Sequence, residues 1–100
     1  MFQGKKVLIT GGTGSLGQAL TKRLLTLEVD IVRIFSRNES KQIEMESKFS
    51  DDRLRFLLGD VRDIHRLTRA SENIDYVFHT AALKHVPKIE YNPFEAINTN

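Results

Sequence analysis

A glycine-rich turn between an apolar run and an amphipathic segment constrains the fold of this chain more than any other feature. The turn is Thr10-Gly11-Gly12-Thr13-Gly14-Ser15-Leu16-Gly17, and it follows the apolar run Val7-Leu8-Ile9. The apolar residues after the turn recur at the spacing of one helix face. They are Leu16, Ala19, Leu20, Leu24 and Leu27. This order predicts a strand, a tight turn and a helix, a layout that can present backbone N–H groups to a pyrophosphate.

The glycines are spaced as Gly11-x-x-Gly14-x-x-Gly17. We expect the turn to need unusual backbone angles, and a Cβ at its centre would hold phosphates away from the amides. Gly17, one turn into the helix, would let the helix lie close to the strand. The alternative is a tight strand-to-helix turn with no ligand.

Composition excludes several classes of protein. The chain has 100 residues with a formal net charge of +2, and it contains no cysteine. It has no run of five like charges, which argues against binding to nucleic acid or an anionic membrane. No apolar stretch is long enough to span a membrane, and no signal-peptide pattern precedes the first strand. We expect a cytoplasmic protein without disulfides.

Strand and helix patterns alternate along the chain. Ser36-Arg37-Asn38-Glu39 fits a capping box, with Ser36 as the N-cap of the second helix. Asp63 is expected to cap the third helix, with Ile64, Leu67 and Ala70 facing inward. The predicted strands are 7–10, 31–35, 54–58 and 76–80, and the predicted helices are 15–27, 36–49, a short one after Asp63, and one from Pro93 to the end.

This βαβαβαβα order predicts an α/β fold, a Rossmann-like doubly wound parallel sheet with strand order 3-2-1-4. The helix begun at Pro93 has barely two turns before Asn100. We therefore expect residues 1–100 to be the N-terminal part of a single dinucleotide-binding domain, with the rest of the domain and the substrate region absent.

The loops after the four strands should meet at one edge of the sheet, where ligands bind. The loop after the second strand carries Ser36, Arg37 and Lys41, and no acid stands where NAD-binding proteins hold the ribose 2′-hydroxyl. A hydroxyl, a guanidinium and an ammonium at a helix N-terminus favour an anion, so we predict a 2′-phosphate and hence NADP. The alternative is that Ser36 only caps the helix and both cations are solvated.

The later loops offer weaker candidates. Asp60 could accept a hydrogen bond from the adenine amino group, with the Val61 backbone beside the ring, although a turn aspartate is the plainer interpretation. Lys84 and His85 would lie near the substrate, although a lone lysine or histidine in a loop is usually just solvated. His79 is interpreted as a satisfied core histidine, and the three histidines lack metal-ligand spacing. We predict no metal site.

At these residues the chain resembles the extended short-chain dehydrogenase/reductase family along its full length. More narrowly, it is similar to the N-terminal portion of the inverting UDP-N-acetylglucosamine 4,6-dehydratases, which are grouped with polysaccharide biosynthesis proteins. The stretches that carry the resemblance are Thr10–Gly17, Ser36–Gln42, Gly59–Asp63, Ala81–Pro87 and Glu90–Pro93. This chain has Asn38, Ser40 and Thr80 where that family usually has Asp, Leu and Ala.

The resemblance implies a set of NADP-binding residues, in which 13–16 contact phosphates, 36–41 surround the 2′-phosphate, and 60–61 hold adenine. The full set is Gly11, Thr13, Gly14, Ser15, Leu16, Gly17, Ser36, Arg37, Asn38, Glu39, Ser40, Lys41, Asp60, Val61, Thr80, Ala81 and Lys84. Lys84 and His85 would also contact the sugar nucleotide, UDP-N-acetylglucosamine.

The family's catalytic Tyr-x-x-x-Lys pair is missing from this sequence. Tyr76 is followed four residues later by Thr80, and Tyr91 by Glu95. The implied chemistry is C4 oxidation, loss of water across C5 and C6, and hydride return with inversion at C5. We assign no catalytic residue and expect these residues alone to be inactive, within a full-length protein that forms homo-oligomers. The alternatives are a sugar-nucleotide 4-epimerase or reductase, and a non-catalytic NADP-sensing regulator.

Overall fold

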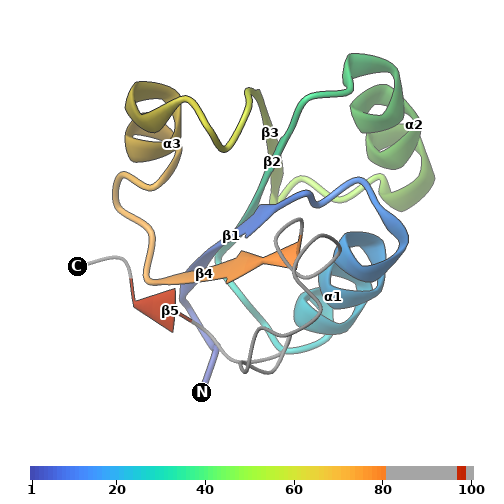
Figure 1. The fold of residues 1–100 in the computed structure, drawn as a ribbon. Helices are drawn as coiled ribbons and strands as arrows, with labels where there is room; N and C mark the ends of the chain where they lie inside the picture. Colours follow the sequence, from blue (N-terminus) through green and yellow to red (C-terminus); the bar gives the residue numbers. More distant parts are fainter. Residues whose placement is uncertain (81–96, 99–100) are drawn as a thin grey trace.

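Strands and helices alternate in the computed structural model, which describes residues 1–80 and 97–98 (Figure 1). The strands are β1 (Lys6–Thr10), β2 (Ile31–Ser36), β3 (Leu54–Leu58), β4 (Tyr76–His79) and β5 (Ile97–Asn98). The helices are α1 (Ser15–Leu25), α2 (Glu39–Phe49) and α3 (Ile64–Ala70). Within these ranges no helix has both the length and the apolar character that a membrane crossing requires.

The strands form one sheet in the order β3-β2-β1-β4-β5. β1 lies between β2 and β4 and runs parallel to both, with Val7 opposite Val32 on one side and Tyr76 on the other. Helices α1 and α2 cover one face of the sheet, and α3 covers the other (Figure 1). The predicted doubly wound α/β fold and the strand order 3-2-1-4 are therefore confirmed.

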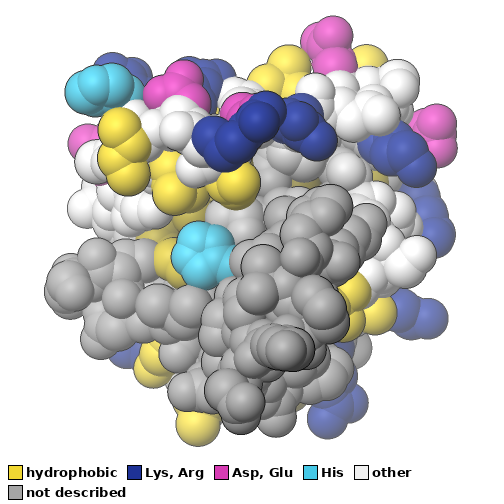
Figure 2. All heavy atoms as spheres, in the orientation of Figure 1, with side chains coloured by type: hydrophobic (Ala, Val, Ile, Leu, Met, Phe, Trp, Pro, Cys, Tyr) yellow, Lys and Arg dark blue, Asp and Glu magenta, His cyan; other side chains and the backbone are white. Residues whose placement is uncertain are grey.

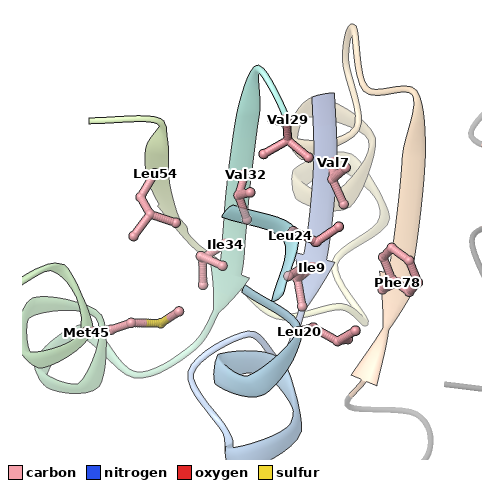
Figure 3. Close-up of a cluster of buried hydrophobic side chains, with 10 residues drawn as sticks. All are labelled: Val7, Ile9, Leu20, Leu24, Val29, Val32, Ile34, Met45, Leu54 and Phe78. Carbon is pink, nitrogen blue, oxygen red and sulfur yellow. The ribbon is translucent and has the colours of Figure 1, made fainter. Parts of the chain in front are cut away.

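Two hydrophobic clusters hold the helices to the sheet, one on each face. Val7 and Ile9 of β1 belong to the larger cluster, whereas Leu8 belongs to the smaller one, because successive side chains of a strand point to opposite faces. The larger cluster lies between the sheet and helices α1 and α2 (Figure 3). β1 is apolar on both faces because both faces are covered by helices.

The second helix begins later than the capping-box pattern predicts. Ser36 is the last residue of β2 and pairs with Leu58 of β3, so it does not cap the helix. Asn38 is the N-cap instead, and its side-chain oxygen accepts a hydrogen bond from the Lys41 N–H at 3.1 Å. The prediction of Ser36 as N-cap was wrong because pairing with β3 extends the strand through this residue.

The third helix is capped by Asp63, as predicted, and its side chain accepts from the Arg66 N–H at 3.2 Å. Ala70 is fully buried, but Ile64 is 64% exposed, so the prediction that Ile64 faces inward was wrong. The two residues are six positions apart, which places them about 120° apart around the helix. The side of α3 that packs through Ala70 therefore leaves Ile64 in solvent.

The C-terminal end of the described chain differs from the predicted helix. Residues 93–96 lie outside the described residues, but Ile97–Asn98 forms a strand, so the helical prediction was wrong there. β5 runs antiparallel to β4, pairing Tyr76 with Asn98 and Val77 with Ile97. This pairing gives the outer edge of β4 a neighbouring strand at those two residues.

Candidate functional site

A cleft of about 590 Å³ lies at the carboxyl ends of the parallel strands. Its volume falls within the range of about 300–1,000 Å³ typical of small-molecule and cofactor sites. It is surrounded by residues from the ends of β1, β2 and β4, from the loops after β1, β2 and β3, and from the first turn of α2. They are Thr10, Gly11, Thr13, Gly14, Phe35, Ser36, Arg37, Asn38, Lys41, Gly59, Asp60, Val61, Arg62 and His79.

The glycine turn forms one wall of this cleft. Gly11 has a φ of 69°, in the left-handed region that favours glycine, and its N–H donates to the Phe35 carbonyl at 2.8 Å. Gly14 is the N-cap of α1, and no side chain of the described residues caps that helix. The amides of the first helical turn thus lack an internal partner and are suited to hold an anion.

Gly17 brings α1 against the turn itself. A Cβ at this position would lie 2.4 Å from the Cα of Gly12, a distance that real side chains do not tolerate. Gly12 is also enclosed, because its Cβ would lie 2.7 Å from a methyl group of Ile34. Because Gly12 and Gly17 carry no side chains, the start of α1 packs closely against the glycine turn, and the turn packs closely against β2. This close packing fixes the position of this wall of the cleft.

Ser36 and Gln42 form the junction between the ends of β2 and β3. Gln42 is buried, and its amide nitrogen donates to Ser36 Oγ at 2.9 Å and to the Leu57 carbonyl at 3.2 Å. The Ser36 carbonyl accepts from the Gly59 N–H at 2.9 Å. These bonds fix the Ser36 side chain at the cleft wall.

Positive charge gathers in the same cleft, where two arginine side chains contact one carboxylate. Arg62 donates through Nη2 to Asp60 Oδ2 at 2.8 Å, and Arg37 Nη1 lies 3.6 Å from the same oxygen. The hydrogen bonds from Arg62 hold the pKa of Asp60 well below its usual range, so the group stays ionised. With Lys41, the cluster carries three cations and one anion. Figure 2 shows Lys and Arg side chains in a row along the upper edge of this face, between α3 and α2.

The floor of the cleft lies between β1 and β4. Thr10 Oγ1 is 3.1 Å from His79 Nδ1, and burial lowers the pKa of the histidine, so the ring is neutral at pH 7. His79 is hydrogen-bonded, as interpreted, but it is only partly buried and lines the cleft, so its placement in the core was wrong. The hydroxyl of Thr80 donates to the Thr10 carbonyl at 2.6 Å, which directs it toward the backbone of the glycine turn.

The structure brings most of the predicted binding residues together. Those that line the cleft are Gly11, Thr13, Gly14, Ser36, Arg37, Asn38, Lys41, Asp60 and Val61. Those described but not lining it are Ser15, Leu16, Gly17, Glu39, Ser40 and Thr80. The predicted residues Ala81, Lys84 and His85 lie outside the described residues.

Sequence reasoning missed several residues of the cleft. Arg62 stands two residues after Asp60 and forms its closest ion pair, a spacing that could have indicated a paired turn. Phe35 packs directly against Gly59, and a side chain at Gly59 would clash with it, because a Cβ there would lie 2.5 Å from the Phe35 ring. Thr10 belongs to the glycine-rich turn but was not among the predicted binding residues. No local pattern marks His79 as a cleft residue, since its position depends on the pairing of β1 with β4.

A family model described as "Polysaccharide biosynthesis protein" matches residues 7–100. This match includes the glycine turn and every segment that forms the cleft. The chain belongs to this family.

Curated relatives that match the whole chain include a dehydratase and an epimerase. The inverting UDP-N-acetylglucosamine 4,6-dehydratase of Campylobacter jejuni (strain 81-176) is 52% identical over 101 residues. The UDP-glucose 4-epimerase of Rickettsia akari is 50% identical over 104 residues. In each case the alignment covers 100% of this chain and 30% of the relative. The chain therefore spans about 30% of the length of these relatives.

Solved structures agree with the fold. The structure named Pen, from Bacillus thuringiensis, has a TM-score of 0.80 and 48% identity, covering 96% of this chain and 30% of that one. The enzyme WbmF of Bordetella bronchiseptica, solved in complex with NAD⁺ and UDP, has a TM-score of 0.64 and 29% identity. That alignment covers 78% of this chain and 23% of WbmF. The chain thus has the Rossmann-like fold of nucleotide-sugar enzymes among the short-chain dehydrogenases/reductases.

Proposed function

We propose that this chain is the NADP-binding N-terminal part of a nucleotide-sugar 4,6-dehydratase, a lyase that acts on UDP-N-acetylglucosamine in polysaccharide biosynthesis. We further propose that the full-length protein works in the cytoplasm as a homo-oligomer. A relative named for this activity is 52% identical over the full length of this chain, which supports the proposal.

The observation that carries the cofactor assignment is the charge around the end of β2. Arg37, Lys41 and Arg62 line the same cleft, and the only carboxylate among the described cleft residues, Asp60, is engaged by two arginines. A 2′-phosphate carries about −1.5 to −2 charges at neutral pH, which matches the net positive charge of this wall. A ribose 2′-hydroxyl would instead favour an acidic partner at the end of β2, where Ser36 stands.

The rest of the cleft fits a dinucleotide. The uncapped N-terminus of α1 offers backbone donors for a pyrophosphate, and Gly14 adds no side chain in front of them. Val61 is exposed at the wall beside Asp60, where an adenine ring could lie on its apolar surface. Bound nicotinamide would supply hydride transfer, whereas the residues of this chain would bind and orient the cofactor.

A second candidate within the same fold is a nucleotide-sugar 4-epimerase, which is favoured by the 50% identity to the Rickettsia akari epimerase. The two activities share the cofactor cleft and differ in the fate of the oxidised sugar. Incubating the full-length protein with UDP-N-acetylglucosamine separates them, because a dehydratase forms a 4-keto-6-deoxy sugar and an epimerase forms UDP-N-acetylgalactosamine. A non-catalytic NADP sensor would form neither.

Calorimetric titration with NADP⁺ and NAD⁺ tests the cofactor assignment. We expect the full-length protein to bind NADP⁺ more tightly, and Arg37→Ala to weaken that complex by about 1.5–3 kcal/mol, the scale of a hydrogen bond to a charged group. The affinity for NAD⁺ should change much less. Arg23→Ala, on α1 and not among the cleft residues, is the matched control. Equal affinities for the two cofactors in the wild-type protein would contradict the assignment.

A further inference from the structure

Gln42 is a buried polar side chain that the proposed cofactor contacts do not use. It is 6% exposed and lies in the first half of α2, facing the ends of β2 and β3. Its amide nitrogen lies 2.9 Å from Ser36 Oγ, 3.2 Å from the Leu57 carbonyl oxygen and 3.5 Å from the Ser36 carbonyl oxygen. One amide group thus connects two neighbouring strands at the wall of the cleft.

The orientation of this amide follows from its partners. A backbone carbonyl can only accept a hydrogen bond, so the group that faces Leu57 must be the NH₂ of Gln42. The opposite orientation would place two carbonyl oxygens against each other in a buried position, which costs free energy. Ser36 Oγ, 2.9 Å from the same nitrogen, therefore accepts a hydrogen bond from Gln42.

This contact decides what the Ser36 hydroxyl can do. A serine hydroxyl has one proton to donate and lone pairs to accept. Since Gln42 donates to the hydroxyl oxygen, this bond does not use the hydroxyl proton, which is left for another partner. Within residues 1–80 and 97–98, that proton meets no protein acceptor, and Ser36 lines the cleft together with Arg37 and Lys41.

We infer that Gln42 is a positioning residue that makes the Ser36 hydroxyl a committed hydrogen-bond donor to the adenosine 2′-phosphate. The inference rests on the proposed function, because it concerns the same cofactor site. A hydrogen bond to a charged phosphate is about twice as strong as one to a neutral hydroxyl. Gln42 therefore contributes to the preference for the phosphorylated cofactor without touching it.

The test compares ligands that differ only in the 2′-phosphate. We would measure the affinities of 2′,5′-ADP and 5′-AMP, and of NADP⁺ and NAD⁺, for the full-length wild-type protein and for Gln42→Met. We expect about a tenfold loss for the 2′-phosphorylated ligands and less than about a threefold loss for the others. Gln3→Met is the matched control, because Gln3 makes an exposed hydrogen bond to Glu28 away from the cleft.

A double-variant cycle tests whether Gln42 acts through Ser36. If it does, Gln42→Met should change the ratio of the two affinities very little in a Ser36→Ala background, because the donor is already gone. Equal, independent losses in the two backgrounds would overturn the inference. A wild-type protein that prefers NADP⁺ while Gln42→Met keeps the full preference would also overturn it and leave the proposed function intact. A wild-type protein without the preference would overturn both.

A measurement without a variant covers the case in which Gln42→Met does not fold. The side-chain amide protons of Gln42 can be followed by NMR in the isotopically labelled wild-type protein. Since hydrogen bonds in a chain polarise one another, 2′,5′-ADP should shift this resonance more than 5′-AMP does. Equal shifts with the two ligands would overturn the inference.

Discussion

At the scale of single residues, the glycines of the turn are needed for different physical reasons. Gly11 needs backbone freedom, because its φ is 69°. Gly14 has a φ of −77° and a ψ of 176°, an extended conformation that any residue adopts. What Gly14 provides is therefore the absence of a side chain at the cleft wall, and this difference can be tested by substitution.

Replacing Gly14 with valine should leave the fold intact and remove cofactor binding. Its backbone angles suit valine, and the N-cap makes no side-chain hydrogen bond that would be lost. The new side chain would occupy the space in front of the helix amides. Circular dichroism should be unchanged while calorimetry detects no NADP⁺ binding. Ala19→Val, at an exposed position of α1, is the control, and normal NADP⁺ binding by Gly14→Val would show that the loop is only a turn.

His79 should make stability depend on pH. Burial lowers its pKa below the ordinary 6.5, so the unfolded chain binds a proton more readily than the folded one. The contribution of His79 to the free energy of unfolding is then fully present above pH 6.5. It is lost as the pH falls from 6.5 through the lower pKa of the folded state. The urea midpoint should decrease over this range in the wild-type protein and decrease less in His79→Gln. His65→Gln, at an exposed position, is the control, and an equal decrease in His79→Gln would contradict the prediction.

At the scale of elements, the contact between α1 and the glycine turn sets the wall of the cleft. Alanine at Gly17 would gain up to about 1 kcal/mol in helix propensity. Its Cβ, however, would lie 2.4 Å from the Gly12 Cα, so the helix must move away from the sheet. Overpacking of this kind costs about 1–3 kcal/mol, and here the opposing atoms are backbone, which cannot rotate away. The packing cost should exceed the gain in propensity.

We therefore expect Gly17→Ala to lower the free energy of unfolding by about 1–2 kcal/mol and to weaken NADP⁺ binding as well. Urea denaturation with an unchanged m-value would measure the first effect, and calorimetry the second. Lys22→Ala, on the exposed side of α1, should leave both properties close to wild type. If Gly17→Ala were at least as stable as the wild-type protein, α1 could shift away from Gly12 at no cost in stability, which would contradict the prediction.

At the scale of the whole molecule, the chain contains the cleft that we propose for the cofactor but not the Tyr-x-x-x-Lys pair of the family it resembles. At one edge of the sheet, β5 pairs with Tyr76 and Val77 of β4, and these are its only pairings among the described residues. A short two-residue partner stabilises an edge weakly, so we expect a polypeptide of only these residues to have loose tertiary structure or to aggregate.

That 100-residue polypeptide should form no 4-keto-6-deoxy product from UDP-N-acetylglucosamine and NADP⁺. It has no tyrosine–lysine pair for proton transfer, and binding groups alone do not supply a general base. Product analysis by chromatography and NMR would measure this, with the Campylobacter jejuni dehydratase as the positive control. Product formation at a comparable rate would show that catalysis does not need further residues. A sharp, reversible melt of a monodisperse monomer would contradict the expectation about stability.

The sequence by itself determined the glycine turn and the positions of most elements, because each rests on local patterns. It also determined the strand order, because alternating strands and helices with right-handed crossovers leave few arrangements. Apolar runs, helix spacing and the Asp63 cap act over a few residues, so they can be recognised without the fold. The tertiary structure alone decided where Ser36 lies, because its pairing with Leu58 and its bond to Gln42 override a local capping pattern. It also decided that Thr10 and His79 meet at the floor of the cleft, and that Arg62 joins Arg37 on one carboxylate. These contacts join neighbouring strands or successive loops at one edge of the sheet, and sequence periodicity carries no information about which side chains meet there.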